Sequence, residues 1–410
     1  MSPTKNRYPV ESHKVIIFGA GRIGRSFIGQ LFGCNGYNVI FIDIDPVIVE
    51  GLNKRGSYRI IIKGEKDEEI IVPNVQAIYA SDTDKVANAI ATADIMAVSV
   101  GKNALDKVIP VMAYGLILRQ ELNPGSPLDI IIAENMRSAK DFVKSRLTRN
   151  LPADYPIDKL VGLVETSIGK MVPFMTSEEL KKDPLMIYAE PYNTLILDRK
   201  EFKSPIPQIK QFAPKDNIKA WVDNKAFLHN LGHATAAYFG FFKRPEKKYL
   251  YEVLDDTEVF DFTKDVMLQS ADLLQIAYPD EFTSDELTQQ VDDLLIRFRN
   301  KALRDTVYRV GQDLIRKLGF DDRFMGAIRL AIRHGMPYNI ILKAMSYGFF
   351  FKAKDENGTY YKSDIEFLEA VSKDFRKALV KYIGLDRLKD RIIINELADN
   401  CKDHTTVNLR

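Results

Sequence analysis

Residues 14–24 read Lys-Val-Ile-Ile-Phe-Gly-Ala-Gly-Arg-Ile-Gly, and residues 37–43 read Tyr-Asn-Val-Ile-Phe-Ile-Asp. The two apolar runs are typical of parallel strands that are covered on both faces of a sheet. Between them lie a G-x-G-x-x-G loop and a stretch with helical periodicity, residues 25–32. This order of strand, glycine loop, helix, strand and acid predicts a Rossmann-type dinucleotide-binding domain.

The glycine loop predicts how a dinucleotide is held. Gly19 permits a tight turn, Gly21 lets the backbone approach a pyrophosphate, and Gly24 lets the helix pack closely on the strand. The pyrophosphate would lie on the N-terminus of the helix. The expected cofactor-binding residues are Gly19, Ala20, Gly21, Arg22, Ile23, Gly24, Asp43 and Gly101.

Asp43 lies 19 residues beyond Gly24, at the end of the second predicted strand. A carboxylate at this place accepts hydrogen bonds from the adenosine ribose and repels a 2′-phosphate, which favours NAD over NADP. The alternative interpretation is a glycine turn in an α/β protein that binds no dinucleotide.

Two more buried strands are predicted, at residues 94–101 and 127–136. The first ends in Gly101, which we expect near the nicotinamide side of the cofactor. The second carries Asn135 at its tip. Ligands of doubly wound sheets bind at the carboxyl ends of the strands, so Asn135 is expected where substrate meets cofactor. Alternatively, Asn135 caps the helix that follows.

The rest of the chain divides near residue 210, at a proline-rich boundary. Before it, residues 57–62 and 69–72 predict a hairpin, and three further strands are predicted at 161–168, 185–190 and 193–198. Beyond it, helical patterns dominate, at 216–240, 246–275, 284–302, 304–318, 322–334, 338–347 and 364–382. We expect an α/β Rossmann-type doubly wound sheet over residues 1–210 and a mostly α-helical catalytic and substrate domain over residues 211–410.

Residues 225–233 read Lys-Ala-Phe-Leu-His-Asn-Leu-Gly-His. On a helix each residue turns about 100°, which places Lys225, Asn230 and His233 within a fan of roughly 140°. These three can converge on one small substrate as base, oxyanion donor and orienting group. The flanking residues are apolar, and burial lowers the pKa of a lysine toward the range useful for a general base. The alternative is an amphipathic helix in which Lys225 reaches solvent and the other two satisfy each other.

Composition narrows the functional class. Lys and Arg number 58 against 56 Asp and Glu, so there is no net field for nucleic acid or an anionic membrane. The two cysteines form no disulfide framework, which suits a reducing compartment. No apolar run reaches the ~18 residues of a membrane span, and the first residues lack a signal-peptide pattern. We expect a cytoplasmic protein with a small-molecule substrate and no nucleic-acid or membrane partner.

With these motifs in order, the chain resembles the long-chain polyol (mannitol) dehydrogenase family. The matching segments are residues 19–29, 126–136, 225–240, 307–318 and 334–338. The resemblance implies NAD-dependent, metal-independent oxidation of a secondary alcohol on an extended polyol, by a monomer. By position it implies that Lys225 is the general acid/base, that Asn135 and Asn230 stabilise the oxyanion, that His233 orients the substrate, and that Arg309 and Lys317 bind the polyol chain.

One stretch departs from the family pattern. Residues 168–173 read Ile-Gly-Lys-Met-Val-Pro, where the family usually carries Val-Asp-Arg before an apolar-x-Pro. Gly169 thus replaces an acid that helps to hold the substrate, and Lys170 replaces an arginine. We therefore expect the distal end of the substrate to be read differently. The tail, residues 398–410, has no counterpart in the resemblance.

The substrate is expected to be anionic. Arg309, Arg316 and Lys317 lie within nine residues and Arg323 follows shortly, and arginine suits bidentate binding of phosphate or carboxylate. Alternatively, Arg316 and Arg323 lie on a solvated helix face. With the resemblance, anion binding favours mannitol 1-phosphate and fructose 6-phosphate. A hexuronate reductase acting on tagaturonate or fructuronate, and a dehydrogenase of free mannitol or arabinitol, are the alternatives within the family.

Two further alternatives come from other classes of protein. His229 and His233 stand four residues apart and could share a metal in a metal-dependent alcohol dehydrogenase, although no Glu lies between them and no cysteine pair is present. An NAD-sensing regulator without activity is the non-enzymatic reading. The retained lysine, asparagine and histidine of residues 225–233 argue against it.

Overall fold

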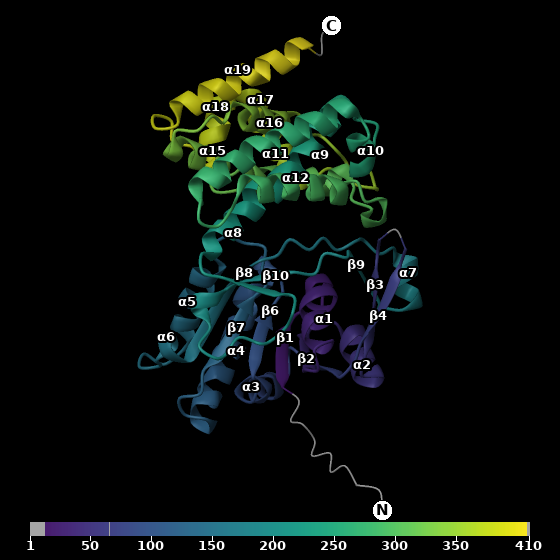
Figure 1. Ribbon diagram of the computed structural model, residues 1–410, viewed down its shortest axis with the longest axis vertical. Coiled ribbons are helices and arrows are strands. Elements are labelled where there is room, and N and C mark those ends of the chain that lie inside the picture. The colour runs from purple at the N-terminus through teal and green to yellow at the C-terminus, as the bar shows by residue number, and fades with distance from the viewer. Residues whose placement is uncertain (1–12, 65, 408–410) are drawn as a thin grey trace, which may run out of the picture. The chain divides into compact units, whose positions relative to one another are not determined.

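The computed structural model describes residues 13–64 and 66–407. The chain divides into two compact units, Met1–Ile218 and Lys219–Arg410, which we call the N-terminal and C-terminal units (Figure 1). The sequence places the boundary near residue 210. Strand β11 (Phe212–Lys215) lies beyond that point and pairs with β10 (Leu195–Asp198), and this pairing keeps the segment in the N-terminal unit.

An eight-stranded sheet forms the centre of the N-terminal unit, in the order β11-β10-β8-β7-β6-β1-β2-β5. Neighbouring strands are parallel except β8 and β10, which are antiparallel. The other strands are β1 (Lys14–Phe18), β2 (Asn38–Asp43), β5 (Val75–Tyr79), β6 (Ile95–Val98), β7 (Leu128–Ile132) and β8 (Val161–Ser167). The predicted doubly wound sheet is therefore confirmed.

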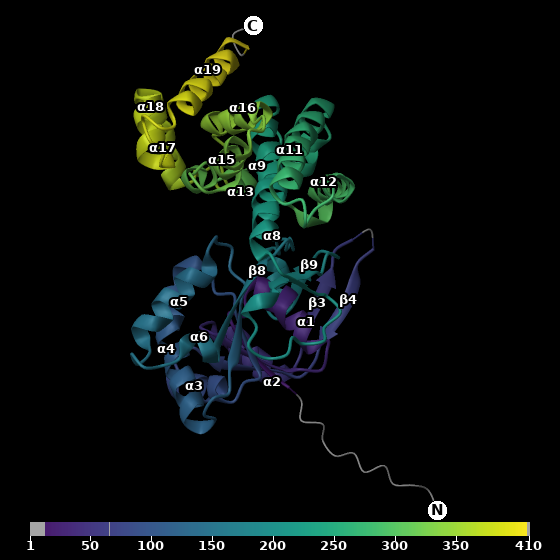
Figure 2. The same cartoon turned by 60° about the vertical axis from the view of Figure 1, so that its left-hand side comes forward.

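Helices cover both faces of this sheet. Successive side chains of β1 point to opposite faces, so each face receives its own set of apolar side chains. Val15 and Ile17 pack with helices η1 (Gly24–Gly29), α1 (Gln30–Gly33) and α2 (Pro46–Arg55). Ile16 and Phe18 pack with α3 (Thr83–Ala91), α4 (Lys102–Leu122) and α5 (Ala139–Asn150). Figure 2 shows these three helices on one side of the sheet. Burying each such side chain contributes about 1.5–3 kcal/mol, which explains the continuous apolar run.

A smaller sheet of three strands accompanies the large one. Strands β3 (Tyr58–Ile62) and β4 (Glu68–Val72) form the predicted hairpin, and β9 (Ile187–Ala189) adds to β3 in parallel. The strand predicted at 185–190 thus exists, but it joins this small sheet. Three short helices complete the unit: α6 (Ile157–Leu160), α7 (Ser177–Lys182) and η2 (Arg199–Glu201).

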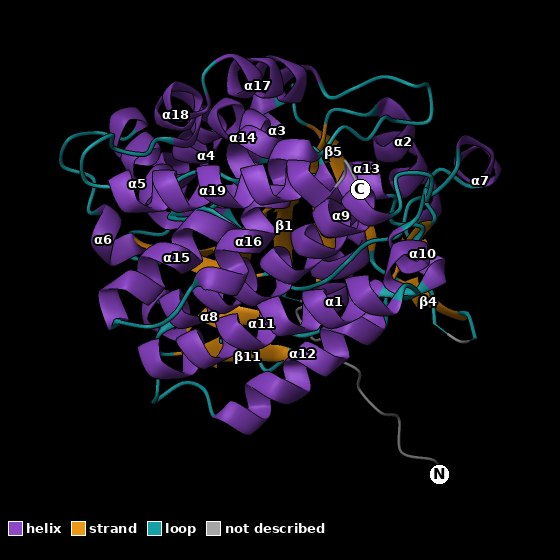
Figure 3. Ribbon diagram, turned by 90° about the horizontal axis from the view of Figure 1, so that it is seen from above, coloured by secondary structure: helices purple, strands orange, loops and turns teal. Residues whose placement is uncertain are grey.

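The C-terminal unit is helical, as predicted, and all named strands (orange in Figure 3) end by residue 215 of the part that the structure describes. Its main helices are α8 (Ile218–Asn224), η3 (Lys225–Asn230), α9 (Leu231–Lys243), α10 (Leu250–Leu254), α11 (Thr257–Ala277), α12 (Ser284–Phe298), α13 (Val307–Gly311), α14 (Leu314–Lys317), α15 (Arg323–His334), α16 (Asn339–Tyr347), α17 (Lys362–Lys373), α18 (Phe375–Ala378) and α19 (Arg391–Val407). Short helical turns lie at η4 (Lys301–Leu303), η5 (Gly348–Phe350) and η6 (Leu379–Ile383).

Helix α9 lies at the centre of this unit. Its residues from Leu231 to Gly240 are buried apart from His233, and a helix that is apolar all round belongs in a core. It packs against α10, α11, α13 and α16. This central helix continues directly from η3, so residues 225–233 span the junction of η3 and α9.

Two predicted helices are each divided in the structure. The helix expected at 246–275 is interrupted at Asp256, whose carboxylate accepts from the backbone N–H groups of Glu258 and Val259 and so starts α11. The helix expected at 304–318 is interrupted at Asp313, which adopts a left-handed conformation with φ of 70°. The carboxylate of Asp364 accepts from the N–H groups of Asp313 and Leu314 and holds this break.

Helix α19 includes much of the tail that the sequence left unassigned. It packs against α16, with Leu397 fully buried. His404 is also buried there: its Nε2 lies 2.7 Å from Ser346 Oγ, and its ring stacks on Tyr347 with 4.0 Å between centroids. The tail is therefore part of the helical core as far as residue 404.

Candidate active site

The glycine loop joins β1 to η1 and brings backbone against backbone. Gly19 has a φ of 91°, and a Cβ atom there would lie 2.6 Å from the carbonyl oxygen of Ser99. A Cβ atom on Gly24 would overlap the carbonyl oxygen of Gly19. By contrast, a Cβ atom on Gly21 would meet nothing within 4 Å. The fold thus requires glycine at positions 19 and 24. Gly21 leaves open space where the sequence predicts a pyrophosphate.

Asp43 lies beside this loop at the carboxyl end of β2. Its Oδ2 accepts a hydrogen bond from Ala20 N at 2.6 Å, and its Oδ1 accepts from Asp45 N at 2.9 Å. A carboxylate offers about four lone-pair sites, so these two bonds leave acceptor capacity for ribose hydroxyls. Together with the open space at Gly21, this geometry fits NAD.

Arg22 adds a positive charge to the loop. Its guanidinium group lies 4.7 Å from the centroid of the Phe174 ring, a cation–π contact between the loop and the segment after β8. Such a cation next to an open helix N-terminus favours a bound pyrophosphate. The sequence places Arg22 in the loop but does not predict its contact with Phe174.

A buried carboxylate joins the tips of β6 and β7. Gly101, at the start of α4, has a φ of 85°, and its N–H donates to Glu134 Oε1 at 3.0 Å. Burial raises the pKa of Glu134. Because Asn135 follows Glu134 directly, this bond brings Gly101 and Asn135 to one part of the sheet edge. The sequence places Glu134 beside Asn135 at the strand tip but does not predict this hydrogen bond.

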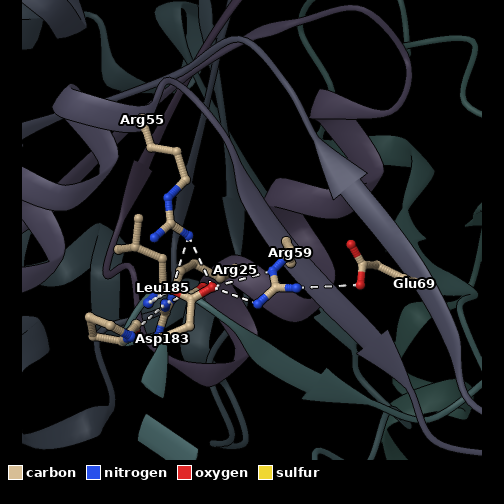
Figure 4. Close-up of polar contacts among 7 residues, drawn as sticks. Arg25, Arg55, Arg59, Glu69, Asp183 and Leu185 are labelled. Carbon is tan, nitrogen blue, oxygen red and sulfur yellow. Dashed lines mark hydrogen bonds and ion pairs between the residues drawn. The ribbon is translucent and has the colours of Figure 1, made fainter. Parts of the chain in front are cut away.

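Arg25 joins the glycine loop to the turn that precedes β9 (Figure 4). Its side chain is 6% exposed; Nε donates to Ala20 O at 2.7 Å and Nη1 to Leu185 O at 2.8 Å. Nearby, the carboxylate of Asp183 pairs with Arg55 at 2.9 Å and Arg59 at 3.1 Å. Arg25 thus donates hydrogen bonds to backbone carbonyl groups, and these bonds hold the glycine loop in place.

Lys170, one of the departures from the family pattern, is engaged inside the N-terminal unit. The side chain is buried, and Nζ donates to Asn193 Oδ1 at 2.8 Å and to Gln30 Oε1 at 3.3 Å. A Cβ atom on the neighbouring Gly169 would make an ordinary contact with the Tyr192 ring at 3.5 Å. Lys170 therefore contributes to packing beside η1 through two amide oxygens.

Lys225 begins a π-helical segment, η3, in the C-terminal unit. Because π-helical hydrogen bonds run from i to i+5, each residue turns through less than 100°, and the fan of 140° expected from an α-helix is wrong here. The Lys225 side chain is only partly exposed. Burial, with repulsion from Arg323, lowers its pKa to about 8, in the direction that the apolar flanks predict.

Asn230 ends η3, and its backbone is held by a buried arginine. Arg323 Nη1 donates to Asn230 O at 3.3 Å, while its Nε donates to Asp322 Oδ1 at 2.8 Å. Arg323 thereby links the lysine and the asparagine: its charge acts on Lys225 and its hydrogen bond fixes the Asn230 backbone.

His233 lies one turn further along, with its ring stacked on Phe298 at 4.6 Å between centroids and 11° between planes. Its Nε2 is 3.3 Å from Asp305 Oδ2. Burial lowers the pKa of His233 well below its usual value, and repulsion from Arg309 adds to this, so the imidazole is neutral at pH 7. His229 packs on the same Phe298 ring at 5.5 Å.

The described residues hold no group of three or more His, Cys, Asp and Glu side chains arranged for a metal. His229 and His233 face each other at 6.0 Å between ring centroids, edge to face. The ligand set that a catalytic zinc site uses, three protein side chains, is therefore not assembled around this pair in the part of the chain that the structure describes.

The predicted substrate-binding cations gather around the same elements. Lys317 is buried, and its Nζ donates to Val310 O at 2.5 Å. Burial and repulsion from Arg323 and Arg316 lower its pKa well below the usual value. Three arginines each pair with a carboxylate: Arg309 with Asp305, Arg316 with Asp313, and Arg323 with Asp322.

The structure thus groups five of the predicted catalytic and substrate-binding residues in the C-terminal unit: Lys225, Asn230, His233, Arg309 and Lys317. Asn135 belongs to the N-terminal unit. The carboxylates at positions 305, 313 and 322 were not anticipated, although each stands one to four residues from the arginine it pairs with. An i, i+4 or i, i+3 spacing of Asp and Arg is the signal that would have found the first two.

Comparison with known proteins gives a family match for each of the two units. The family model of the mannitol dehydrogenase Rossmann domain matches residues 13–211, and that of the mannitol dehydrogenase C-terminal domain matches residues 217–405. A curated mannitol-1-phosphate 5-dehydrogenase from Lactiplantibacillus plantarum is 31% identical over 390 residues, covering 94% of this chain and 97% of its own length. The chain belongs to the mannitol dehydrogenase family.

Family membership confirms the predicted enzyme class, an NAD-dependent oxidoreductase of the polyol dehydrogenases. The second family match extends to residue 405, so most of the tail that lacked a counterpart belongs to the family domain. No helix among the described residues is long and apolar enough to cross a membrane.

Solved structures show the same fold. The Pseudomonas fluorescens mannitol 2-dehydrogenase, in ternary complex with NAD and D-mannitol, superposes with a TM-score of 0.73 at 14% identity. That likeness covers 95% of this chain and 91% of the other. An octopine dehydrogenase in complex with NADH and agmatine gives a TM-score of 0.51 at 14% identity, over 92% of this chain and 99% of the other.

The loop glycines give a first prediction. Gly24→Ala should lower the free energy of unfolding by about 1–3 kcal/mol because its methyl group has no space. Gly21→Ala should leave unfolding unchanged and weaken NAD binding, because its methyl group enters the open space. Thermal unfolding and titration with NAD measure the two effects. Wild-type NAD affinity in Gly21→Ala would place the pyrophosphate elsewhere.

Asp43 gives a second prediction. The wild type should prefer NAD to NADP by about 10- to 100-fold, because the carboxylate repels the 2′-phosphate at close range. Asp43→Ser should reduce this preference while activity persists. Asp82→Ser is the control, since Asp82 caps α3 and serine is also a good cap. Equal kcat/KM with the two cofactors in the wild type would contradict the assignment.

Proposed function

We propose that this enzyme interconverts mannitol 1-phosphate and fructose 6-phosphate, with NAD as cofactor, without a metal, and with Lys225 as general acid/base. The observation that carries the proposal is the lysine itself: a partly buried side chain with a pKa near 8, in a family of polyol dehydrogenases. The relative at 31% identity, named a mannitol-1-phosphate 5-dehydrogenase, supports the choice of substrate.

Lys225 would take the proton of the secondary hydroxyl during oxidation. A lysine with an ordinary pKa near 10.4 is almost wholly protonated at neutral pH and is a poor base. Lowering the pKa to about 8 makes the neutral amine available near physiological pH. In the reverse direction the ammonium form protonates the reduced ketose, and this form prevails below the same pKa. NAD, when bound, supplies the hydride acceptor.

The amide groups of Asn135 and Asn230 would stabilise the alkoxide that forms as the proton leaves. Donors that are already oriented need no reorganisation when charge develops, and loss of one such donor typically costs 10²–10³ in kcat. The hydrogen bond from Arg323 to Asn230 O supports this orientation on the helical side. Asn135 follows Glu134, whose bond to Gly101 N restrains the strand tip.

The cations near η3 would recognise the phosphate. Arg316 is the most exposed of the three arginines, with 43% of its side chain accessible. Arg309 forms an ion pair with Asp305, and Asp305 in turn lies against His233. The Arg309 side chain therefore holds Asp305 in addition to any contact with the substrate. We therefore assign the phosphate chiefly to Arg316, with Lys317 and Arg309 closer to the polyol chain.

Removing the base should abolish most of the activity. We expect Lys225→Ala to lower kcat by about 10²–10⁴-fold, because this is what a general base contributes. NAD binding should persist. Oxidation by the wild type should rise with pH through an ionisation near 8, and the variant should lack it. Lys219→Ala, which removes an exposed lysine from the preceding helix, should keep the wild-type profile. Wild-type turnover in Lys225→Ala would exclude this role.

The phosphate assignment predicts substrate preference. Fructose 6-phosphate should be reduced far more efficiently than fructose, and salt should raise its KM because screening weakens charge attraction. Arg316→Ala should lower kcat/KM for fructose 6-phosphate about 10- to 100-fold, the worth of a charged hydrogen bond, and spare fructose. Arg309→Ala should impair both, because it also releases Asp305.

Two outcomes of that experiment would contradict the phosphate assignment. Equal kcat/KM with fructose and fructose 6-phosphate would show that the enzyme does not recognise the phosphate. Rapid reduction of tagaturonate or fructuronate, with fructose 6-phosphate inert, would select a uronate carboxylate as the anion.

A further inference from the structure

Asp305 is a buried carboxylate that the proposed mechanism leaves without a task. It is 5% exposed and lies just before α13. Its backbone is well fixed: the carbonyl oxygen accepts from Leu250 N at 2.8 Å, and the next residue, Thr306, caps α13 and forms a β-bridge with Tyr249. A carboxylate is expensive to bury, so its surroundings must compensate for the lost hydration.

Its two oxygens face two different partners. Oδ1 forms an ion pair with Arg309, one helical turn away. Oδ2 lies 3.3 Å from Nε2 of His233. Both of these facing atoms are buried, and among the described residues neither makes a hydrogen bond, although they lie 3.3 Å apart. The carboxylate and the imidazole are thus the polar groups available to each other.

The chemistry of the pair decides where the imidazole proton lies. An ionised carboxylate only accepts hydrogen bonds, and a neutral imidazole has one N–H donor and one acceptor nitrogen. His233 is neutral because burial, with Arg309 and Lys317, lowers its pKa. A proton on Nε2 turns a donor toward the carboxylate oxygen, whereas a proton on Nδ1 would set two lone pairs against each other.

Two further contacts restrict the ring. Phe298 stacks on His233 with an interplanar angle of 11°, which fixes the plane of the imidazole. Arg309 offsets the charge of Asp305, so the carboxylate can accept a hydrogen bond without drawing a second proton onto the imidazole. The other groups that act electrostatically on His233, Arg323 and Arg297 among them, also disfavour the imidazolium form.

We infer that Asp305, held by Arg309, is a positioning residue that keeps His233 in the Nε2–H form, so that Nδ1 accepts a hydrogen bond from a substrate hydroxyl. The substrate part of this inference rests on the proposed function. It specifies the direction of the hydrogen bond: the substrate donates to His233, as a polyol hydroxyl can. Arg309 then serves the site through Asp305 as well as through its charge.

The tautomer can be measured without any substrate. The chain has five histidines, so ¹⁵N-labelled histidine in the full-length protein gives few signals, and His233→Gln identifies those of His233. The wild type should show a protonated Nε2 and an unprotonated Nδ1. Asp305→Asn should shift His233 toward the Nδ1–H form, because an amide N–H can then donate to Nε2. A protonated Nδ1 in the wild type would overturn the inference, as would unchanged His233 signals in Asp305→Asn.

Kinetics provide the second readout. Asp305→Asn should lower kcat/KM for the polyol about 10- to 100-fold, as does the loss of a group that orients a metal-bound histidine, and leave the KM for NAD unchanged. Asp305→Glu, which keeps the carboxylate, should recover much of the loss. Asp292→Asn, which removes an exposed carboxylate paired with Lys264, is the control and should match the wild type. An Asp305→Asn enzyme with wild-type kcat/KM would refute the positioning role.

These outcomes separate the inference from the proposed function. If no polyol is turned over by the wild type, the proposed function fails, while the tautomer still tests the role of Asp305. If Asp305→Asn does not fold, the tautomer of the wild type alone decides, because only a protonated Nε2 is compatible with the geometry.

Discussion

The N-terminal unit depends on the approach of two stretches of backbone at Gly19 and Gly24. No side chain fits between them, and this closeness sets helix η1 directly on β1 and against the end of β6. Arg25, one residue later, uses its buried guanidinium to bind the loop and the chain at Leu185. Asp43 bonds to the loop from the next strand. The open space at Gly21 is what this arrangement leaves for a ligand.

The C-terminal unit solves a different problem, the burial of several cations around one helix. Asp305, Asp313 and Asp322 each pair with an arginine, so the arginine charges are compensated locally. Burial lowers the pKa of Lys225 and the pKa of Lys317. Paired arginines stay charged and hold positions, whereas a lysine with a lowered pKa can exchange a proton. The arginines are therefore suited to binding and positioning, and the lysines to proton transfer.

Helix geometry around Lys225 contributes to the same end. The π-helical turn places the lysine, the asparagine and the histidine differently from a regular α-helix, and most of the α9 helix that follows is buried. A residue carried on so rigid an element keeps its orientation. Single π turns inside helices are frequent at functional sites, which agrees with the position of η3.

Much of this protein is determined by local sequence. The apolar runs at 14–18 and 38–43, the glycine spacing and Asp43 suffice to predict the parallel sheet and its cofactor, because buried parallel strands and a backbone-lined anion site each demand few residue types. The motif at 225–233 likewise predicts a lysine of lowered pKa, since its apolar neighbours lie in the same stretch.

Other features are decided only by tertiary structure. The parallel pairing of β9 with β3, the break at Asp313 and the burial of α19 all depend on groups distant in the chain, such as the carboxylate of Asp364. The π-helical turn at Lys225 is compatible with an ordinary helical pattern in the sequence. The approach of Asp305 to His233 joins residues 72 positions apart, and no local periodicity encodes it. Tertiary packing decides which partner a buried charge pairs with. An unpaired charge becomes costly only when the packing of separate helices removes it from water.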